Sequence, residues 1–284
     1  MDFSFTQEQD DLRSEARRFL EANSSPSMEQ LAELGWVGIL SSDDFTFLDA
    51  AVIIEELGRV LYDGPYVLNE VAAQGGDEVW SIEIDGFVPH LEQVTRVLTA
   101  DMQGAPAAGE TIATVDETLG LGRLTRNGTE PAQGTWDDTR RRLLAAFALE
   151  AVGIGSRAIE MALAYASERE QFGKKIGSYQ AISHSLVDGY VAVELARSLA
   201  YWAAWSVAEN DEQVDLAVAA AKSQATEAAV LACEKSIQAH GGIGFTWEHP
   251  LHRYYKRALW LEGALGYGRE HRAEIAESLL AGQA

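Results

Sequence analysis

The sequence predicts a mainly α-helical fold with three consecutive parts: an N-terminal helical domain at 1–75, a reduced β segment at 76–135, and a C-terminal four-helix bundle at 136–284. Apolar residues recur at helical spacing in the first and last parts. Between them, glycine and threonine become frequent and short runs alternate between apolar and polar residues, which is typical of strands and turns. The long helical stretches of the last part are joined mostly by short loops, which favours antiparallel packing.

Three helices are expected in the first part. Thr6 and Gln9 form a capping box, in which each side chain binds the other residue's backbone N–H, before a helix at about 7–22. A second, short helix ends at Gly35, because glycine is favoured just past a helix C-terminus. A third helix is expected at 46–61, where apolar residues keep helical spacing.

Four short strands are expected in the middle part, at 80–84, 96–99, 111–115 and 122–125. About sixty residues are few for an independent β domain, because a small fold buries too little of its surface. We therefore expect this sheet to lean on the helices or on another chain.

The last part is expected to hold four long helices, at about 137–169, 180–209, 211–240 and 250–280. Gly173 and Gly177 separate the first two, since glycine is unfavourable inside a helix.

Composition excludes several function classes. A formal net charge of −22 argues against nucleic acid or an anionic membrane as a partner, because both reward clustered cations. No apolar stretch is long enough to span a bilayer, and the opening MDFSFTQEQDD is not a targeting segment. The single cysteine, Cys233, cannot form an internal disulfide, which favours a reducing, cytoplasmic location. It lies in an apolar helical run, so we expect a buried, inert thiol and no metal site.

Two segments carry the candidate binding chemistry. The first, Arg169-Glu-Gln-Phe-Gly-Lys-Lys-Ile-Gly-Ser-Tyr-Gln180, presents a guanidinium, an amide and an aromatic ring at a helix end, which suits a nucleotide cofactor. The second, Gln238-Ala-His-Gly-Gly-Ile-Gly-Phe245, has three glycines in four positions, so its backbone can approach a ligand closely. It is neither a Walker loop nor a Rossmann fingerprint. From the residues alone, a helix–loop–helix corner is the simpler interpretation of each.

Together the two segments resemble the acyl-CoA dehydrogenase family, with R-x-Q-F-G-x-x-I-G-x-x-Q and Q-x-x-G-G-x-G-F at the family's separation. The similarity covers 140–284 and extends weakly to LAELGWVG at 31–38 and EELGR at 55–59. It implies a helical domain, a middle β domain and a C-terminal four-helix bundle, with FAD bound noncovalently across a subunit interface. It also implies an acyl-CoA substrate and an electron-transferring flavoprotein as electron acceptor.

The resemblance also implies roles for individual residues. Arg169 would pair with the FAD pyrophosphate of a neighbouring chain, and Phe172 would pack near its flavin or adenosine. The full set of implied cofactor contacts is Arg169, Gln171, Phe172, Gln238, Gly241 and Gly242, of which the last three would line the adenosine side.

The catalytic base is missing from its usual positions. Removal of an α-proton needs a carboxylate beside the substrate's α-carbon. The two positions at which the family carries this group hold Leu143 and Leu265, and leucine cannot accept a proton. The nearest carboxylates are Glu150, which could be buried with a raised pKa, and Glu262, which resembles an ordinary helix-face charge. We assign the catalytic role to neither.

Two further segments are assigned no role. Trp80-Ser81 replaces the family's aromatic-Thr-Ser flavin element, and we interpret it as part of a strand in the core. The basic run Arg253, Lys256 and Arg257 is interpreted as a solvated helix face, with CoA phosphates or a partner chain as alternatives.

Three functions stay open. The chain could supply part of an FAD site shared with a full-length dehydrogenase-like partner that carries the base. Such an α2β2 assembly resembles those of actinobacterial steroid side-chain degradation, and implies a steroid side-chain CoA as substrate. A self-sufficient dehydrogenase using Glu150 or Glu262 is the second hypothesis, and a non-catalytic scaffold or regulatory subunit is the third.

Overall fold

The computed structural model describes residues 5–42, 44–72 and 74–281, so the ends of the predicted first and last parts lie outside it. The helices are α1 (Gln7–Ala22), α2 (Met28–Glu33), α3 (Phe47–Val60), α4 (Tyr66–Ala72), α5 (Trp136–Glu168), α6 (Gln180–Ala208), α7 (Val214–His240), α8 (Leu251–Gly263) and α9 (Gly268–Ala281). The strands are β1 (Trp80–Ile82), β2 (Arg96–Leu98), β3 (Gln103–Pro106), β4 (Gly109–Thr111), β5 (Gly122–Leu124), β6 (Glu130–Pro131), β7 (Glu170–Gln171) and β8 (Lys174–Lys175). The mainly α-helical fold class is confirmed, while the boundaries at residues 75 and 135 stay predictions.

The local signals at the N-terminus predict its helices correctly. The Thr6 hydroxyl accepts the Gln9 N–H at 3.2 Å, and the Gln9 side-chain oxygen accepts the Thr6 N–H at 3.2 Å. This reciprocal cap fixes the start of α1. Gly35 follows α2 with a φ of +74°, a conformation that glycine adopts without strain.

The β segment forms one four-stranded sheet and one two-stranded sheet. In the larger sheet β1 pairs parallel with β2, which pairs antiparallel with β3, and β3 pairs with β6. The predicted strand at 111–115 is wrong, because β4 ends at Thr111 where its pairing with β5 stops. Trp80 and Ser81 lie in the core, as expected, and the Ser81 hydroxyl donates to the Pro89 carbonyl at 2.6 Å.

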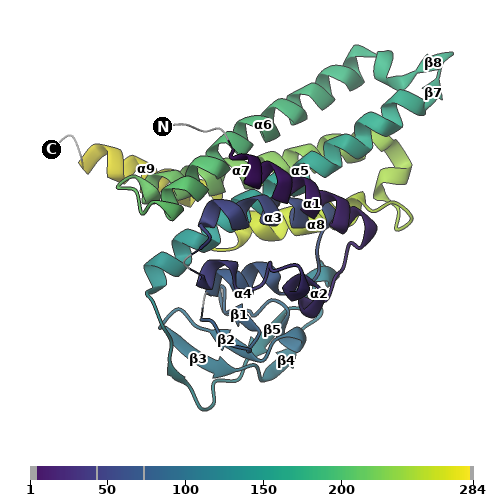
Figure 1. Cartoon of the computed structure of the whole chain (residues 1–284). Helices are drawn as coiled ribbons and strands as arrows, with labels where there is room; N and C mark the ends of the chain where they lie inside the picture. Colours follow the sequence, from purple (N-terminus) through teal and green to yellow (C-terminus); the bar gives the residue numbers. More distant parts are fainter. Residues whose placement is uncertain (1–4, 43, 73, 282–284) are drawn as a thin grey trace.

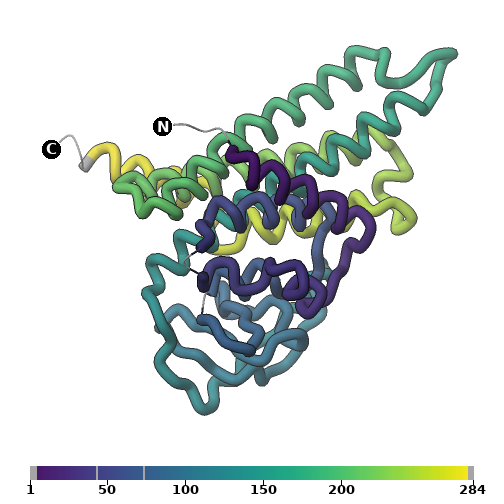
Figure 2. The backbone as a smooth tube through the Cα atoms, viewed as in Figure 1, coloured from purple at the N-terminus to yellow at the C-terminus, as the bar shows by residue number. Residues whose placement is uncertain are grey.

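The C-terminal helices pack side by side across the upper half of the molecule, above the β segment (Figure 1). The single helix predicted at 250–280 is wrong, because α8 and α9 are separate helices. Leu265 and Gly266, between them, have φ values of +60° and +102°. The buried Lys222 ammonium donates to the carbonyls of Glu262 at 3.4 Å and Gly266 at 3.2 Å, which holds this turn in place. The long α5–α6 hairpin projects beyond the remaining elements (Figure 2).

A buried guanidinium joins the three parts of the chain. Arg257 of α8 is 3% exposed, so its prediction as a solvated residue is wrong. It donates to Asp116 at 2.8 Å, to Glu150 of α5 at 2.6 Å and to the Tyr62 carbonyl at 3.4 Å. It also donates to the Thr118 hydroxyl at 2.7 Å. The β segment, the end of α3 and two bundle helices therefore meet at one side chain.

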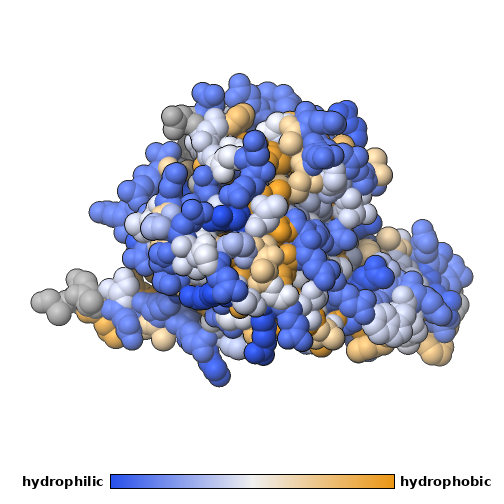
Figure 3. All heavy atoms as spheres, turned by 90° about the horizontal axis from the view of Figure 1, so that it is seen from below, coloured by the Kyte–Doolittle hydropathy of each residue, from blue (hydrophilic) through white to orange (hydrophobic). Residues whose placement is uncertain are grey.

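On the face of the molecule seen from below, hydrophilic residues cover most of the surface (Figure 3). On the face seen from below, hydrophobic atoms gather in a narrow strip near the middle (Figure 3). Among the helices that the structure describes, none is both long and apolar enough to cross a membrane.

We predict that Arg257→Met destabilises the fold by about 3–5 kcal/mol, because it leaves two buried carboxylates without their cation. The free energy of unfolding is measured by urea denaturation. Arg253→Met is the matched control, since Arg253 is exposed on the same helix and its loss should change stability by about 0.5 kcal/mol or less. Equal stability of the two variants would contradict the role assigned to the network.

Candidate functional site

The first motif segment forms a tight hairpin at the end of α5. Strands β7 and β8 pair through Glu170 with Lys175 and Gln171 with Lys174. Phe172 and Gly173 make the turn with φ values of +52° and +83°, as a two-residue hairpin loop with primed geometry requires. The Phe172 side chain is 94% exposed, so the turn displays its ring to solvent.

Several contacts brace this hairpin from behind. The Tyr179 hydroxyl donates to the Gln171 carbonyl at 3.1 Å, and the Lys175 ammonium donates to the Glu168 carbonyl at 2.8 Å. The Lys174 ammonium lies 4.1 Å from the Tyr179 ring centroid. These contacts involve backbone groups and neighbouring lysines. Among the described residues, the Arg169 guanidinium makes no hydrogen bond or ion pair, which leaves it available to an anion.

The second motif segment is the turn that ends α7. Gly241 has a φ of +65°, and a Cβ there would meet open space, so its backbone faces solvent. Gly244 is needed for a different reason, because a Cβ there would lie 2.7 Å from the Ile237 carbonyl oxygen. Gln238 is exposed one helical turn before. The segment therefore presents an amide side chain and uncovered backbone to a ligand outside the chain.

The structure brings the two segments to the same end of the bundle, on the right of Figure 1. Tyr165, one turn before Arg169 on α5, stacks on His240 of α7 with ring centroids 4.4 Å apart. The His240 Nδ1–H donates to the Ser236 carbonyl at 2.7 Å, because a carbonyl oxygen can only accept. Sequence reasoning missed Tyr165, although its position four residues before Arg169 places it on the same helix face.

The donor set at this end suits a dinucleotide that is held mainly by another molecule. A guanidinium can bind a pyrophosphate, and an exposed ring can stack on a base. An open glycine turn lets a ligand come close to the backbone N–H groups. These residues are exposed, so their side chains and backbone are accessible to a ligand or to another chain.

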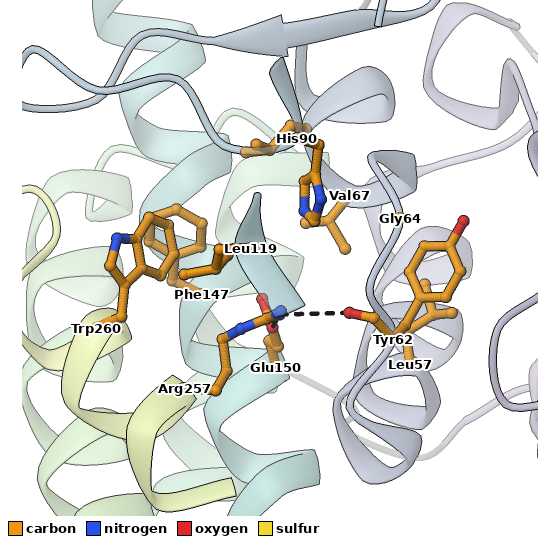
Figure 4. Close-up of a pocket in the computed structure, with 11 residues that line it drawn as sticks. Leu57, Tyr62, Gly64, Val67, His90, Leu119, Phe147, Glu150, Arg257 and Trp260 are labelled. Carbon is orange, nitrogen blue, oxygen red and sulfur yellow. Dashed lines mark hydrogen bonds and ion pairs between the residues drawn. The ribbon is translucent and has the colours of Figure 1, made fainter. Parts of the chain in front are cut away.

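The carboxylate Glu150 lies in a different place, in the interior beside Arg257 (Figure 4). It is buried, as the sequence suggested, and burial raises the pKa of its carboxyl although Arg257 opposes this rise. The cavity beside it measures about 20 Å³ and is lined by apolar groups with His90 and Trp260. This volume holds about one water molecule, so no acyl group fits there.

The other residues considered for the catalytic base lie elsewhere in the structure, apart from Glu150. Leu143 is buried in α5, and Leu265 lies in the turn after α8, where its N–H donates to Asp85 at 2.9 Å. Glu262 is half-buried on α8, and burial and the nearby Glu227 raise its pKa. The structure does not bring Glu150 and Glu262 together. Within the described ranges, no group of three His, Cys, Asp or Glu residues has metal-binding geometry.

Cys233 behaves as expected for a core residue. It is fully buried in α7, and burial raises the pKa of its thiol. Since the thiolate is the reactive form, this cysteine is an inert packing residue.

Residues 133–280 match the family model described as acyl-CoA dehydrogenase, C-terminal domain. Acyl-CoA dehydrogenase IpdE2 of Mycobacterium tuberculosis is 34% identical over 234 residues, which cover 74% of this chain and 71% of that protein. The ChsE4-ChsE5 complex from Mycobacterium tuberculosis contains a chain that superposes with a TM-score of 0.84 at 25% identity, over 99% of both chains. The Tcur3481-Tcur3483 steroid ACAD shares the fold, with a TM-score of 0.83 at 20% identity over 98% of this chain and 99% of that one.

We predict a pH dependence of stability from His90. Burial, together with the charge of Arg257, lowers the pKa of its imidazole to about 3 in the folded state. An unfolded histidine titrates near 6.5, so the unfolded state takes up a proton first as the pH falls. This contribution to stability is fully present above about pH 6.5 and is lost toward pH 3. Between pH 7 and 5, the wild type should lose about 2 kcal/mol more than His90→Asn.

Asparagine is the suitable replacement because His90 has a φ of +56°, which asparagine tolerates. Urea unfolding at the two pH values gives the comparison, and the difference between the proteins isolates His90 from other titrating groups. The same pH dependence in both proteins would show that His90 is solvated.

Proposed function

The chain belongs to the acyl-CoA dehydrogenase family, and we propose that it acts as one subunit of a hetero-oligomer, supplying part of an FAD site completed by a dehydrogenase-like partner. The family resemblance of the two motif segments is thereby confirmed. The cofactor is FAD, which supplies the hydride acceptor for α,β-dehydrogenation of an acyl-CoA. The shared site, its residues and the partner are the proposed part.

The observation that carries the proposal is the exposed, braced end of the bundle. Phe172 is 94% exposed on a hairpin whose backbone is fixed by Tyr179 and Lys175. In this proposal, the cofactor or the partner chain covers the exposed ring. In this proposal, Arg169 would bind the pyrophosphate, and Gln171 and Phe172 would contact the rest of the cofactor. Gln238, Gly241 and Gly242 would line its adenosine side.

The interior supports a partner that carries the base. Glu150 is committed to Arg257 and has about 20 Å³ beside it, and the two family base positions hold leucine. A substrate of ordinary acyl size therefore has no place next to this carboxylate. The proton acceptor would come from the partner chain, whose site the exposed end of this chain would complete.

The relatives support the kind of assembly and substrate that we propose. One similar chain belongs to a complex of two named components, ChsE4 and ChsE5, and another is named a steroid ACAD. We propose an α2β2 assembly acting on a steroid side-chain CoA, with an electron-transferring flavoprotein as acceptor. A homo-oligomer would leave every site without a base at the family's positions.

The test is co-expression with a dehydrogenase-like partner, followed by flavin absorbance and native mass. We expect this chain to be colourless alone and yellow in a complex that contains both chains. A yellow, active preparation of this chain alone would overturn the proposal in favour of a self-sufficient enzyme. A colourless complex of the two chains would favour a scaffold.

We predict that Arg169→Ala lowers the FAD affinity of the co-expressed complex by about 1.5–3 kcal/mol, the worth of one charge-assisted contact. Flavin content is measured at limiting FAD. Arg269→Ala is the control, because Arg269 is an exposed arginine on α9, outside the proposed site. Unchanged flavin occupancy in Arg169→Ala would sink the assignment of this residue.

We predict that Glu262→Gln leaves kcat of the complex within about twofold. Its carboxyl lies near Glu227 and Lys222 of α7, away from the motif segments. Loss of a true general base should instead lower kcat by about a hundredfold or more. Steady-state kinetics decide between these outcomes, and a loss of that size would make Glu262 the base of a self-sufficient enzyme.

A further inference from the structure

An exposed aromatic platform follows the glycine turn and has no role in the residue set described above. Phe245 is 76% exposed and Trp247 is 72% exposed, and Ile243 beside them is also exposed. Three large apolar side chains within five residues are unusual on the surface of so acidic a chain. An aromatic side chain can bury about 150–250 Å² of surface, and an exposed ring leaves much of this area in contact with water.

The Trp247 ring is held in a fixed position. The Trp247 and His252 rings form a T-shaped pair with centroids 4.7 Å apart, and the Lys256 ammonium lies 4.4 Å from the Trp247 ring centroid. His252 and Lys256 are one helical turn apart on α8, so a single helix face positions the indole. The Lys256 ammonium therefore lies over the ring, while 72% of the surface of Trp247 stays exposed to solvent.

Two cations without an ion-pair partner among the described residues lie on α8 near this ring, in a chain whose net charge is −22. Lys256 and the exposed Arg253 make no ion pair among the described residues. Burial and neighbouring cations lower the pKa values of His249 and His252, so these imidazoles are neutral at pH 7. The lasting positive charges therefore come from Lys256 and Arg253, opposed by Glu248, next to Trp247 in sequence, and by Glu117, which lies near His252.

An exposed aromatic ring near two cations and an open glycine backbone suits a purine with attached phosphates. The base can stack on the indole, and the ammonium and guanidinium can meet the phosphates. An acyl chain would gain nothing from the two cations. A protein partner could also cover the ring. Contact with a protein, however, gives no reason for an exposed ring to lie near two cations.

We propose that Trp247, Lys256 and Arg253 form a binding site for an adenosine diphosphate group. This inference rests on the proposed function and deepens it, because both FAD and acyl-CoA carry such a group. In this proposal the Trp247 ring, close to the glycine turn, would position the adenine. Arg253 and Lys256, two of the three residues of the basic run after Pro250, would bind the phosphates.

The test uses the co-expressed complex after removal of its flavin, with ADP as the probe and calorimetric titration as the readout. Trp247→Ala should weaken ADP binding by about 5- to 100-fold, the range expected for losing one base–aromatic stack. Trp247→Phe should restore most of the affinity, and Lys256→Met should weaken binding about tenfold and reduce its salt dependence. Tyr267→Ala is the matched control, because Tyr267 is an exposed ring with an arginine 5.7 Å from its centroid, outside this surface.

Titrations with the two natural sources identify the ligand. If the group belongs to FAD, Trp247→Ala should weaken FAD binding as much as ADP binding, while the affinities for CoA and FMN stay unchanged. If it belongs to acyl-CoA, the CoA affinity should fall instead. Either result supports the site.

Wild-type ADP affinity in Trp247→Ala would overturn the inference. Dissociation of the subunits in this variant, with unchanged ADP affinity in the remaining complex, would also overturn it and make the platform a protein contact. These failures are distinct from failure of the proposed function, which would appear as a wild-type complex without flavin. A complex that is yellow and sensitive to Arg169→Ala, yet indifferent to Trp247→Ala, keeps the shared site and removes only the platform.

Discussion

The ion pairs of the buried Arg257 guanidinium are the interaction on which the remaining structure depends. Its donors reach Asp116 of the β segment, Glu150 of α5 and the Tyr62 carbonyl after α3, three segments far apart in sequence. The β segment has a small apolar cluster of its own, with four buried members. Trp80, Ile82, Ile84 and Leu98 join the β segment to the apolar core of the helices. The Arg257 network adds polar contacts to this attachment, and a buried cation between two carboxylates is costly to break.

The same network decides where binding can occur. It fills the interior next to Glu150 and leaves about 20 Å³, so this buried carboxylate is committed to structure. A raised pKa marks Glu150 as a candidate base by electrostatics, but geometry gives it no substrate to act on. We therefore place the proposed binding site at the exposed end of the bundle, where Arg169 and Phe172 point away from the core.

Local signals in the sequence predicted local structure well and spatial neighbours poorly. The capping box at Thr6 gave the start of α1, since it acts within four residues. Arg257 was placed on the surface because it ends a basic run, although Tyr254, Arg257 and Leu261 share a helical spacing and are all buried. The strand predicted after Thr111 failed because pairing with β5, which no local pattern encodes, sets its end. The motif residues were found by resemblance, whereas Tyr165 and Trp247 were recognisable only from their stacking partners.

Contacts within the chain brace the exposed end of the bundle, and this bracing has a physical consequence. A two-stranded hairpin is marginal on its own, so the contacts of Tyr179 and Lys175 are what hold β7 and β8 in place. The stack of Tyr165 on His240 then fixes the hairpin's helix relative to the glycine turn. Because these side chains are already ordered, a molecule that binds there loses little further conformational entropy on binding. The exposed rings become buried only when that molecule binds. Their burial then contributes to the free energy of binding.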